Sequence, residues 1–115
     1  MWQSNDDRIM DIFDKAKSKN TECFPIICPV CGKQGGHLYL HRYQPEDDRG
    51  GMWTWCSVCC NSMHTSAKIP KWWQNLKTID FDQLAALPDY LENNKADIDE
   101  WVNKLLFLDD SNKQR

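Results

Sequence analysis

Apolar residues recur with a helical spacing near both ends of the chain. In residues 4–18 the i, i+3, i+4, i+7 positions are apolar: Ile9, Ile12, Phe13 and Ala16. Ser4 is the expected N-cap of this helix, with acidic residues in its first turn. Residues 97–109 carry the same pattern at Ile98, Trp101, Val102, Leu105 and Leu106. Asp97 and Glu100 have the spacing of a capping box at its start. Two shorter helical segments are expected before it, at 81–87 and at 88–94, where Pro88 suits a first helical position.

The middle of the chain alternates with a period of two, which is typical of β-strands. The predicted strands are 37–44, 52–56 and 62–68. In the first, Leu38 and Leu40 share one face, and histidine and tyrosine residues share the other. A loop of turn-forming residues, 45–51, joins the first two strands. The sequence therefore predicts a small antiparallel sheet between an N-terminal helix and a C-terminal helical segment, which is an α+β fold.

The expected organisation is a single compact domain with three parts. Residues 1–20 form the N-terminal helix, 21–75 the sheet region and 76–115 the helical segment packed on it. A core of this size is only marginally stable, so we expect a bound metal to add folding free energy.

Two pairs of cysteines supply the metal ligands. Cys28 and Cys31 form one C-x2-C pair, and Cys56 and Cys59 form the second about one hairpin later. Two residues between thiolates let the chain turn around an ion, and such pairs, repeated, are typical of a tetrahedral four-cysteine site. In the first pair Gly32 permits the positive φ angle that follows the second thiolate.

The run Cys-Pro-Val-Cys-Gly, followed by strand, turn, strand and a second C-x2-C, resembles the paired knuckles of a zinc ribbon across residues 26–68. The resemblance implies one structural zinc ion held by the four cysteines in a closed shell. It implies little about biochemical function, because zinc ribbons occur in proteins of transcription and translation, in enzymes and at protein–protein contacts.

Several ligand alternatives remain open. Cys60 stands where the second knuckle would place a glycine, so it competes with Cys59 for the fourth position. His64 and Cys23 are further substitutes. The same spacing also fits two disulfides, a redox pair or a rubredoxin-like iron site.

The charge distribution favours a protein partner. The formal net charge is −3. From Leu76 onward five Lys or Arg oppose nine Asp or Glu, an acidic segment that suits a basic protein. The N-terminus has neither a basic nor an apolar leader region, and no apolar run is long enough to span a membrane. With thiols committed to a metal, these features predict a cytoplasmic protein.

No catalytic motif accompanies the cysteines. The His-x-Glu and Pro-Cys-x-x-Cys elements of a zinc deaminase are absent, and four thiolates close the metal shell. We therefore expect a binding protein and no enzyme. Its six tryptophans exceed what a small ribbon core can bury, and exposed Trp and Tyr beside Arg are typical of an interface. The expected partner-binding residues are Arg42, Tyr43, Trp53, Trp72 and Trp73.

Small size, acidity and aromatic content are similar to those of bacterial immunity proteins, a resemblance of composition alone. It implies a monomer or small oligomer that covers a basic toxin. The alternative is a nucleic-acid-binding ribbon that stacks bases and contacts phosphates through Arg42, Tyr43, Arg49, Trp53, Lys71 and Trp72. A third interpretation places Trp53, Trp55 and Trp101 in a joint core between ribbon and helices.

Overall fold

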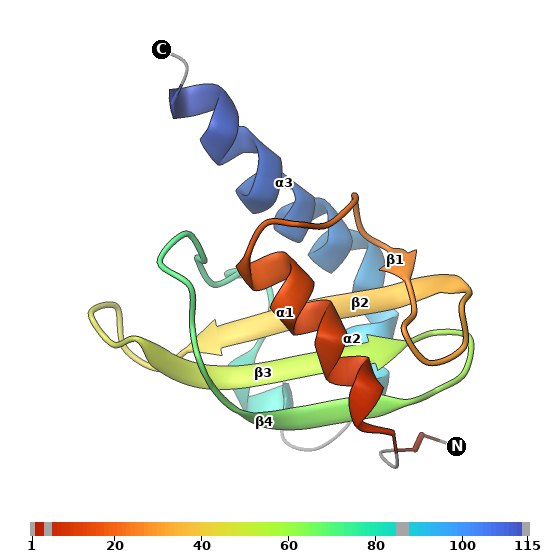
Figure 1. Cartoon of the computed structure of the whole chain (residues 1–115). Helices are drawn as coiled ribbons and strands as arrows, with labels where there is room; N and C mark the ends of the chain where they lie inside the picture. Colours follow the sequence, from red (N-terminus) through yellow and green to blue (C-terminus); the bar gives the residue numbers. More distant parts are fainter. Residues whose placement is uncertain (1, 4–5, 85–87, 114–115) are drawn as a thin grey trace.

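The structure is a computed structural model that describes residues 2–3, 6–84 and 88–113. Its centre is a four-stranded antiparallel sheet in the order β1-β2-β3-β4 (Figure 1). The strands are β1 (Ile26–Ile27), β2 (Gln34–Arg42), β3 (Arg49–Cys56) and β4 (Ser62–Lys68). The helices are η1 (Asp7–Met10), α1 (Asp11–Lys17), η2 (Phe81–Leu84), α2 (Pro88–Asn93) and α3 (Lys95–Lys113). The predicted α+β class is confirmed.

Helices cover both faces of the sheet, as Figure 1 shows with α1 on one side and α3 on the other. A methyl group added at Gly36 would lie 3.0 Å from Ile12 of α1, so α1 packs on the face that also carries Leu38. On the opposite face His37 binds Asp99 of α3. Residues 37 to 40 are consequently all buried, although they alternate between the two faces. None of the described helices combines the length and apolar composition needed to cross a lipid bilayer.

The N-terminal helix begins later than predicted. Its first turn is the 3-10 helix η1, and Asp6 caps it by accepting from the backbone N–H of Arg8 at 3.1 Å. The predicted cap, Ser4, lies outside the described residues. The apolar face is as expected, because Ile9, Ile12 and Ala16 are fully buried.

The C-terminal helix begins earlier and ends later than predicted. The carbonyl of Asn94 accepts from the N–H of Ile98 at 3.0 Å, so helical bonding starts before the expected cap, Asp97. Of the shorter helices, α2 begins at Pro88 as expected, and η2 ends at Leu84. The predicted apolar positions Ala85 and Leu87 lie outside the described residues.

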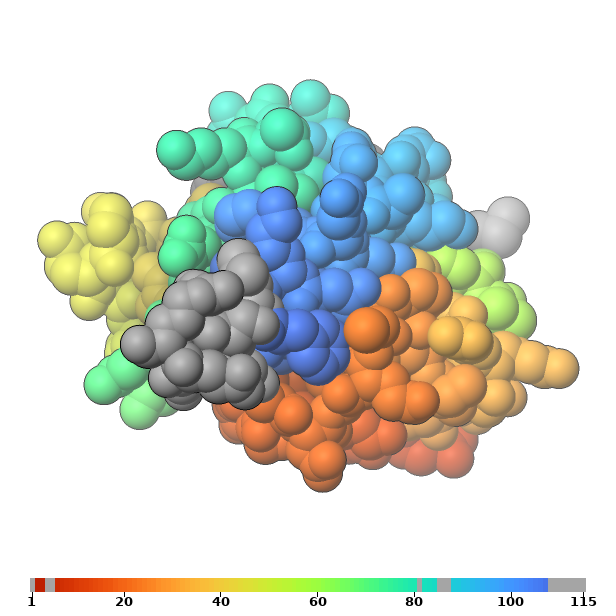
Figure 2. All heavy atoms as spheres, turned by 90° about the horizontal axis from the view of Figure 1, so that it is seen from above, coloured from red at the N-terminus to blue at the C-terminus, as the bar shows by residue number. Residues whose placement is uncertain are grey.

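Asn103 of α3 fastens this helix to the connector that precedes β1. Its side-chain oxygen accepts from the N–H of Phe24 at 2.7 Å, and its amide donates to the Phe24 carbonyl at 3.0 Å. Figure 2 shows the helix lying between that connector and the segment before η2. On the second side the indole of Trp101 donates to the carbonyl of Gln74 at 2.8 Å. One amide side chain thus satisfies both backbone groups of a buried residue.

We expect Asn103→Ala to lower the free energy of unfolding by about 1–3 kcal/mol, because it leaves two backbone groups of Phe24 unpaired. Urea denaturation followed by circular dichroism measures this. The matched control is Asn93→Ala, at an exposed position, which should change stability by less than about 0.5 kcal/mol. Equal effects of the two substitutions would contradict the role given to Asn103.

Candidate metal centre

Two turns of nearly identical geometry form one end of the sheet. In the first, the N–H of Cys28 donates to the Lys33 carbonyl at 2.8 Å, and Gly32 donates to the Cys28 carbonyl at 2.9 Å. In the second, the N–H of Cys56 donates to the Asn61 carbonyl at 3.0 Å, and Cys60 donates to the Cys56 carbonyl at 3.0 Å. Each turn thus closes on its own first cysteine. This repetition gives the two cysteine pairs the same local conformation.

The residue after each second cysteine has a left-handed backbone. Gly32 has a φ angle of 76° and Cys60 one of 63°. Cys60 thus has the positive φ angle expected at the position where the second turn lacks a glycine. Cys60 is strained there, since a side chain in this region costs about 1 kcal/mol.

The four cysteine sulfurs converge between the two turns. Every pair of Sγ atoms among Cys28, Cys31, Cys56 and Cys59 lies within 4.8 Å. The Sγ atoms of Cys28 and Cys59 are 3.8 Å apart, and those of Cys31 and Cys56 are 3.7 Å apart. Zn–S bonds of about 2.3 Å place the thiolates of a tetrahedral site about 3.7 Å apart. The four side chains are therefore positioned to bind one metal ion, and their donor set suits zinc.

Backbone N–H groups of both turns and one side-chain amide donate hydrogen bonds to the sulfurs. Val30 donates to Cys28 Sγ and Val58 to Cys56 Sγ, both at 3.3 Å. The side-chain amide of Asn61 donates to Cys59 Sγ at 3.5 Å. Such donors stabilise thiolate charge, so they favour the deprotonated form that a metal requires.

Burial divides the metal-free thiols into two kinds. It raises the pKa of Cys56 to about 12, and it raises the pKa of Cys28 as well. At Cys59 burial acts in the same direction, but hydrogen bonds from Asn61 and its neighbours prevail and lower the pKa to about 7. Because a bound cation must displace protons from the buried thiols, affinity for metal rises with pH.

The proposed substitutes lie apart from the sulfur cluster in the described structure. The cluster contains Cys59 and not Cys60, whose backbone instead forms the turn. Cys23 is exposed in the connector. The His64 ring stacks on Trp53 with ring centroids 4.2 Å apart. The geometry thus agrees with the four favoured ligands.

A polar network joins the second turn to the C-terminal helices. Ser57 lies between two metal-ligand candidates. Its hydroxyl is hydrogen-bonded to His37 Nε2 at 2.8 Å and donates to Glu92 of α2 at 2.7 Å. Trp55 Nε1 and Lys95 also donate to Glu92, at 3.0 and 2.8 Å. These bonds offset burial and lower the pKa of Glu92.

The far nitrogen of His37 extends this network to α3. His37 Nδ1 lies 2.8 Å from Asp99 Oδ1, and both residues are buried. Burial raises the pKa of Asp99, with the bond to His37 acting against it. The order Asp99, His37, Ser57 is that of a serine-hydrolase triad. Ser57 Oγ also donates to the Glu92 carboxylate, a bond that such a triad does not include, and the direction of its bond with His37 Nε2 depends on the histidine tautomer. Together these bonds link the second turn to α2 and α3.

The residues expected at a partner interface differ in how far they are exposed. Trp53 and Trp73 are buried, with 6% and 2% of their surface exposed, and both contact the Tyr39 ring. Both side chains are therefore largely covered within the chain. Trp55 is also buried, whereas Trp101 is only partly buried. These burials favour the joint-core interpretation for Trp53 and Trp55.

Arg42 is occupied within the chain. Its guanidinium donates to the carbonyls of Asp47, Pro70 and Trp73 at 2.7, 2.7 and 3.1 Å. It therefore fastens the loop after β2 to the segment after β4. Tyr43 remains exposed and Trp72 half-buried. Partner contact through these two residues stays a prediction.

Comparison of the chain with protein-family models, with curated proteins and with solved structures finds no match.

We expect Cys59→Ser to reduce bound zinc well below one ion per chain, because it removes one of the clustered sulfurs. Cys60→Ser, its neighbour, should retain one ion. Native mass spectrometry of both variants measures the stoichiometry. Zinc retained by the first variant and lost by the second would reverse the ligand assignment.

The left-handed backbone predicts opposite effects at equivalent positions of the two turns. Cys60→Gly should raise the free energy of unfolding by about 1 kcal/mol, and Gly32→Ala should lower it by about the same amount. A methyl group at Gly32 would meet no atom within 4 Å, so only backbone conformation changes there. Denaturation of the zinc-loaded proteins tests both, and a destabilised Cys60→Gly variant would argue against strain.

Proposed function

We propose that this protein is a zinc-ribbon module that binds another protein and performs no catalysis, with zinc as a structural element. The observation that carries the proposal is the tetrahedral spacing of four cysteine sulfurs between two matched turns. Four thiolates complete the shell of zinc and leave no position for a substrate or an activated water.

The role given to zinc follows from where the two turns lie. The first turn joins β1 to β2 and the second joins β3 to β4. A metal held by both would join two turns at one end of the sheet that the chain separates by about one hairpin. The second turn also holds the α2 and α3 helices through Ser57. Zinc thereby supports the arrangement of helices that a partner would recognise.

The role given to a protein partner rests on charge. The acidic segment from Leu76 onward contains α2 and α3, and Asp89, Asp97 and Glu100 are exposed there. A surface of this sign attracts a basic protein and speeds association at low salt. A basic toxin neutralised by an immunity-type inhibitor in the cytoplasm is one partner of this chemistry.

The metal part of the proposal is tested by protein purified from its own host without added metal. One zinc ion per chain is the expected result from native mass spectrometry with elemental analysis. Removal by a chelator should abolish the dispersed amide spectrum of the sheet. Iron in place of zinc, or a metal-free protein with an unchanged spectrum, would overturn the structural-zinc role.

The partner part is tested by the same sample. We expect one basic protein to co-purify in a fixed ratio, with an affinity that falls as salt rises. Bound nucleic acid, or tryptophan fluorescence that responds to oligonucleotides at low salt, would favour the alternative. Trp53, one of the residues expected to stack bases in that alternative, is buried.

A further inference from the structure

Within residues 2–3, 6–84 and 88–113, one edge of the sheet is unpaired over most of its length. Strand β4 pairs with β3 on its inner side. On the outer side, the described residues supply only Gln3, which forms a parallel bridge at Asn61 and accepts from the N–H of Ser62 at 2.6 Å. Backbone groups alternate along a strand, so the N–H and C=O groups of His64, Ser66 and Lys68 also face outward. They form a template for an added strand.

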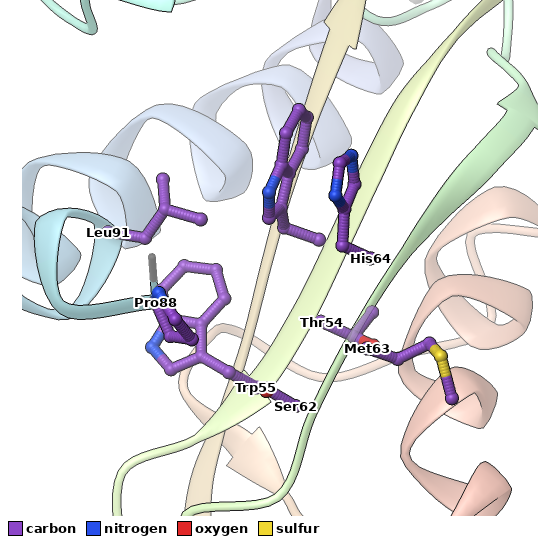
Figure 3. A pocket seen from close by; sticks show the side chains of 8 residues that line it. Thr54, Trp55, Ser62, Met63, His64, Pro88 and Leu91 are labelled. Carbon is purple, nitrogen blue, oxygen red and sulfur yellow. The ribbon is translucent and has the colours of Figure 1, made fainter. Parts of the chain in front are cut away.

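A cavity lies beside the beginning of this edge. Its volume is about 310 Å³, and it lies between the β3–β4 face and the first turns of α2. Figure 3 shows Pro88 and Leu91 opposite His64, with Trp55 at one end, while Met63 turns toward the other face of the sheet. Trp53 and Ser62 complete the wall on this side. The lining is largely aromatic and apolar, and it is of a size that holds one large side chain.

The cavity wall contains an unused hydrogen-bond donor. Trp53 is more than nine-tenths buried, and its indole Nε1 is buried without a hydrogen-bond partner. An unpaired buried N–H is costly, and such groups in a folded protein are uncommon. His64, which stacks on the Trp53 ring, is itself exposed and belongs to the edge strand. An occupant of the cavity that displaces His64 would bring an acceptor within reach of this donor.

The two ends of the β4 edge differ in charge. At the cavity end, Asp89 follows Pro88 and is exposed, with its Oδ1 accepting from the Trp2 indole at 2.6 Å, and the lining includes no Lys or Arg. At the far end Lys68 is exposed. A strand that adds antiparallel to β4, as the other strands pair, places its C-terminal part at the acidic cavity end.

We propose that β4 and this cavity together form a peptide-binding site. Its occupant is an extended segment of the partner protein that adds to the β4 edge. One aromatic or large apolar side chain of the segment enters the cavity, and a Lys or Arg near it lies beside Asp89. Backbone hydrogen bonds supply affinity and the cavity supplies specificity, as in other strand-addition interfaces. The inference rests on the proposed protein-binding function and assigns its contact surface.

The test uses a phage-displayed library of linear seven-residue peptides, selected on the zinc-loaded full chain. We expect enriched peptides with one aromatic or large apolar residue and a neighbouring Lys or Arg. Ser66→Pro removes one outward N–H from the edge without touching the bonds to β3. It should weaken binding of a selected peptide at least about tenfold by calorimetry. The matched control, Ser66→Ala, retains the N–H and should bind within about twofold.

A second measurement needs no substitution. In the wild-type protein the amide protons of His64, Ser66 and Lys68 should exchange quickly when free and slowly with peptide bound. The indole Nε1 signal of Trp53 should shift on binding by more than that of Trp73, which does not line the cavity. Unchanged exchange at the edge, or equal binding by both Ser66 variants, would overturn the proposal.

The remaining outcomes separate this inference from the function on which it rests. A host protein that binds the Ser66→Pro variant as tightly as wild type would retain the protein-binding function and reject the β4 site. A dimer of the isolated chain that Ser66→Pro dissociates would show that a second copy, and no partner peptide, occupies the edge. Failure to recover any partner or peptide would count against both.

Discussion

The fold depends on four cysteine sulfurs held at metal-binding distance between two turns. Each turn is local, closed by hydrogen bonds within six residues, whereas the sulfur cluster joins turns that lie 25 to 31 residues apart. The sheet has one short outer strand, β1, and one open edge, β4, so its own pairing leaves the ends weakly defined. A metal bound at this point would close the end of the sheet where β1 ends and β2 begins. Its bonds to the four sulfurs would act where backbone pairing is least extensive.

The network through Ser57 carries this constraint to the helices. Ser57 lies between Cys56 and the rest of the second turn, and its hydroxyl contacts both His37 and Glu92. Through His37 the network reaches Asp99 on α3, and through Glu92 it reaches Lys95. Polar groups buried in this way are costly unless all are paired, so the arrangement specifies one position for the helices on the sheet. The second turn consequently helps to position both α2 and α3 on the sheet.

The sequence predicts most of the fold and the metal ligands because both depend on short-range patterns. The C-x2-C spacing is local, and the third predicted strand, 62–68, matches β4 at both ends. The Ser57 network could not be predicted, since its bonds span 20, 35 and 62 residues and none of its members belongs to a motif. The same holds for Arg42 and Trp53, which look like surface anchors in the strand pattern. Their roles depend on which helix covers which face, and the alternation of one strand does not contain that information.

The two ends of the described chain differ in how they join the fold. Gln3 is bonded through its backbone to Cys60 and Ser62, and the indole of Trp2 donates to Asp89 at 2.6 Å. In contrast, α3 extends beyond the sheet toward its last residues (Figure 1). A purification tag joined ahead of Trp2 would therefore press on the second cysteine turn and on α2. A tag placed after α3 leaves the metal centre and the β4 edge clear, and it is the appropriate design for work on this protein.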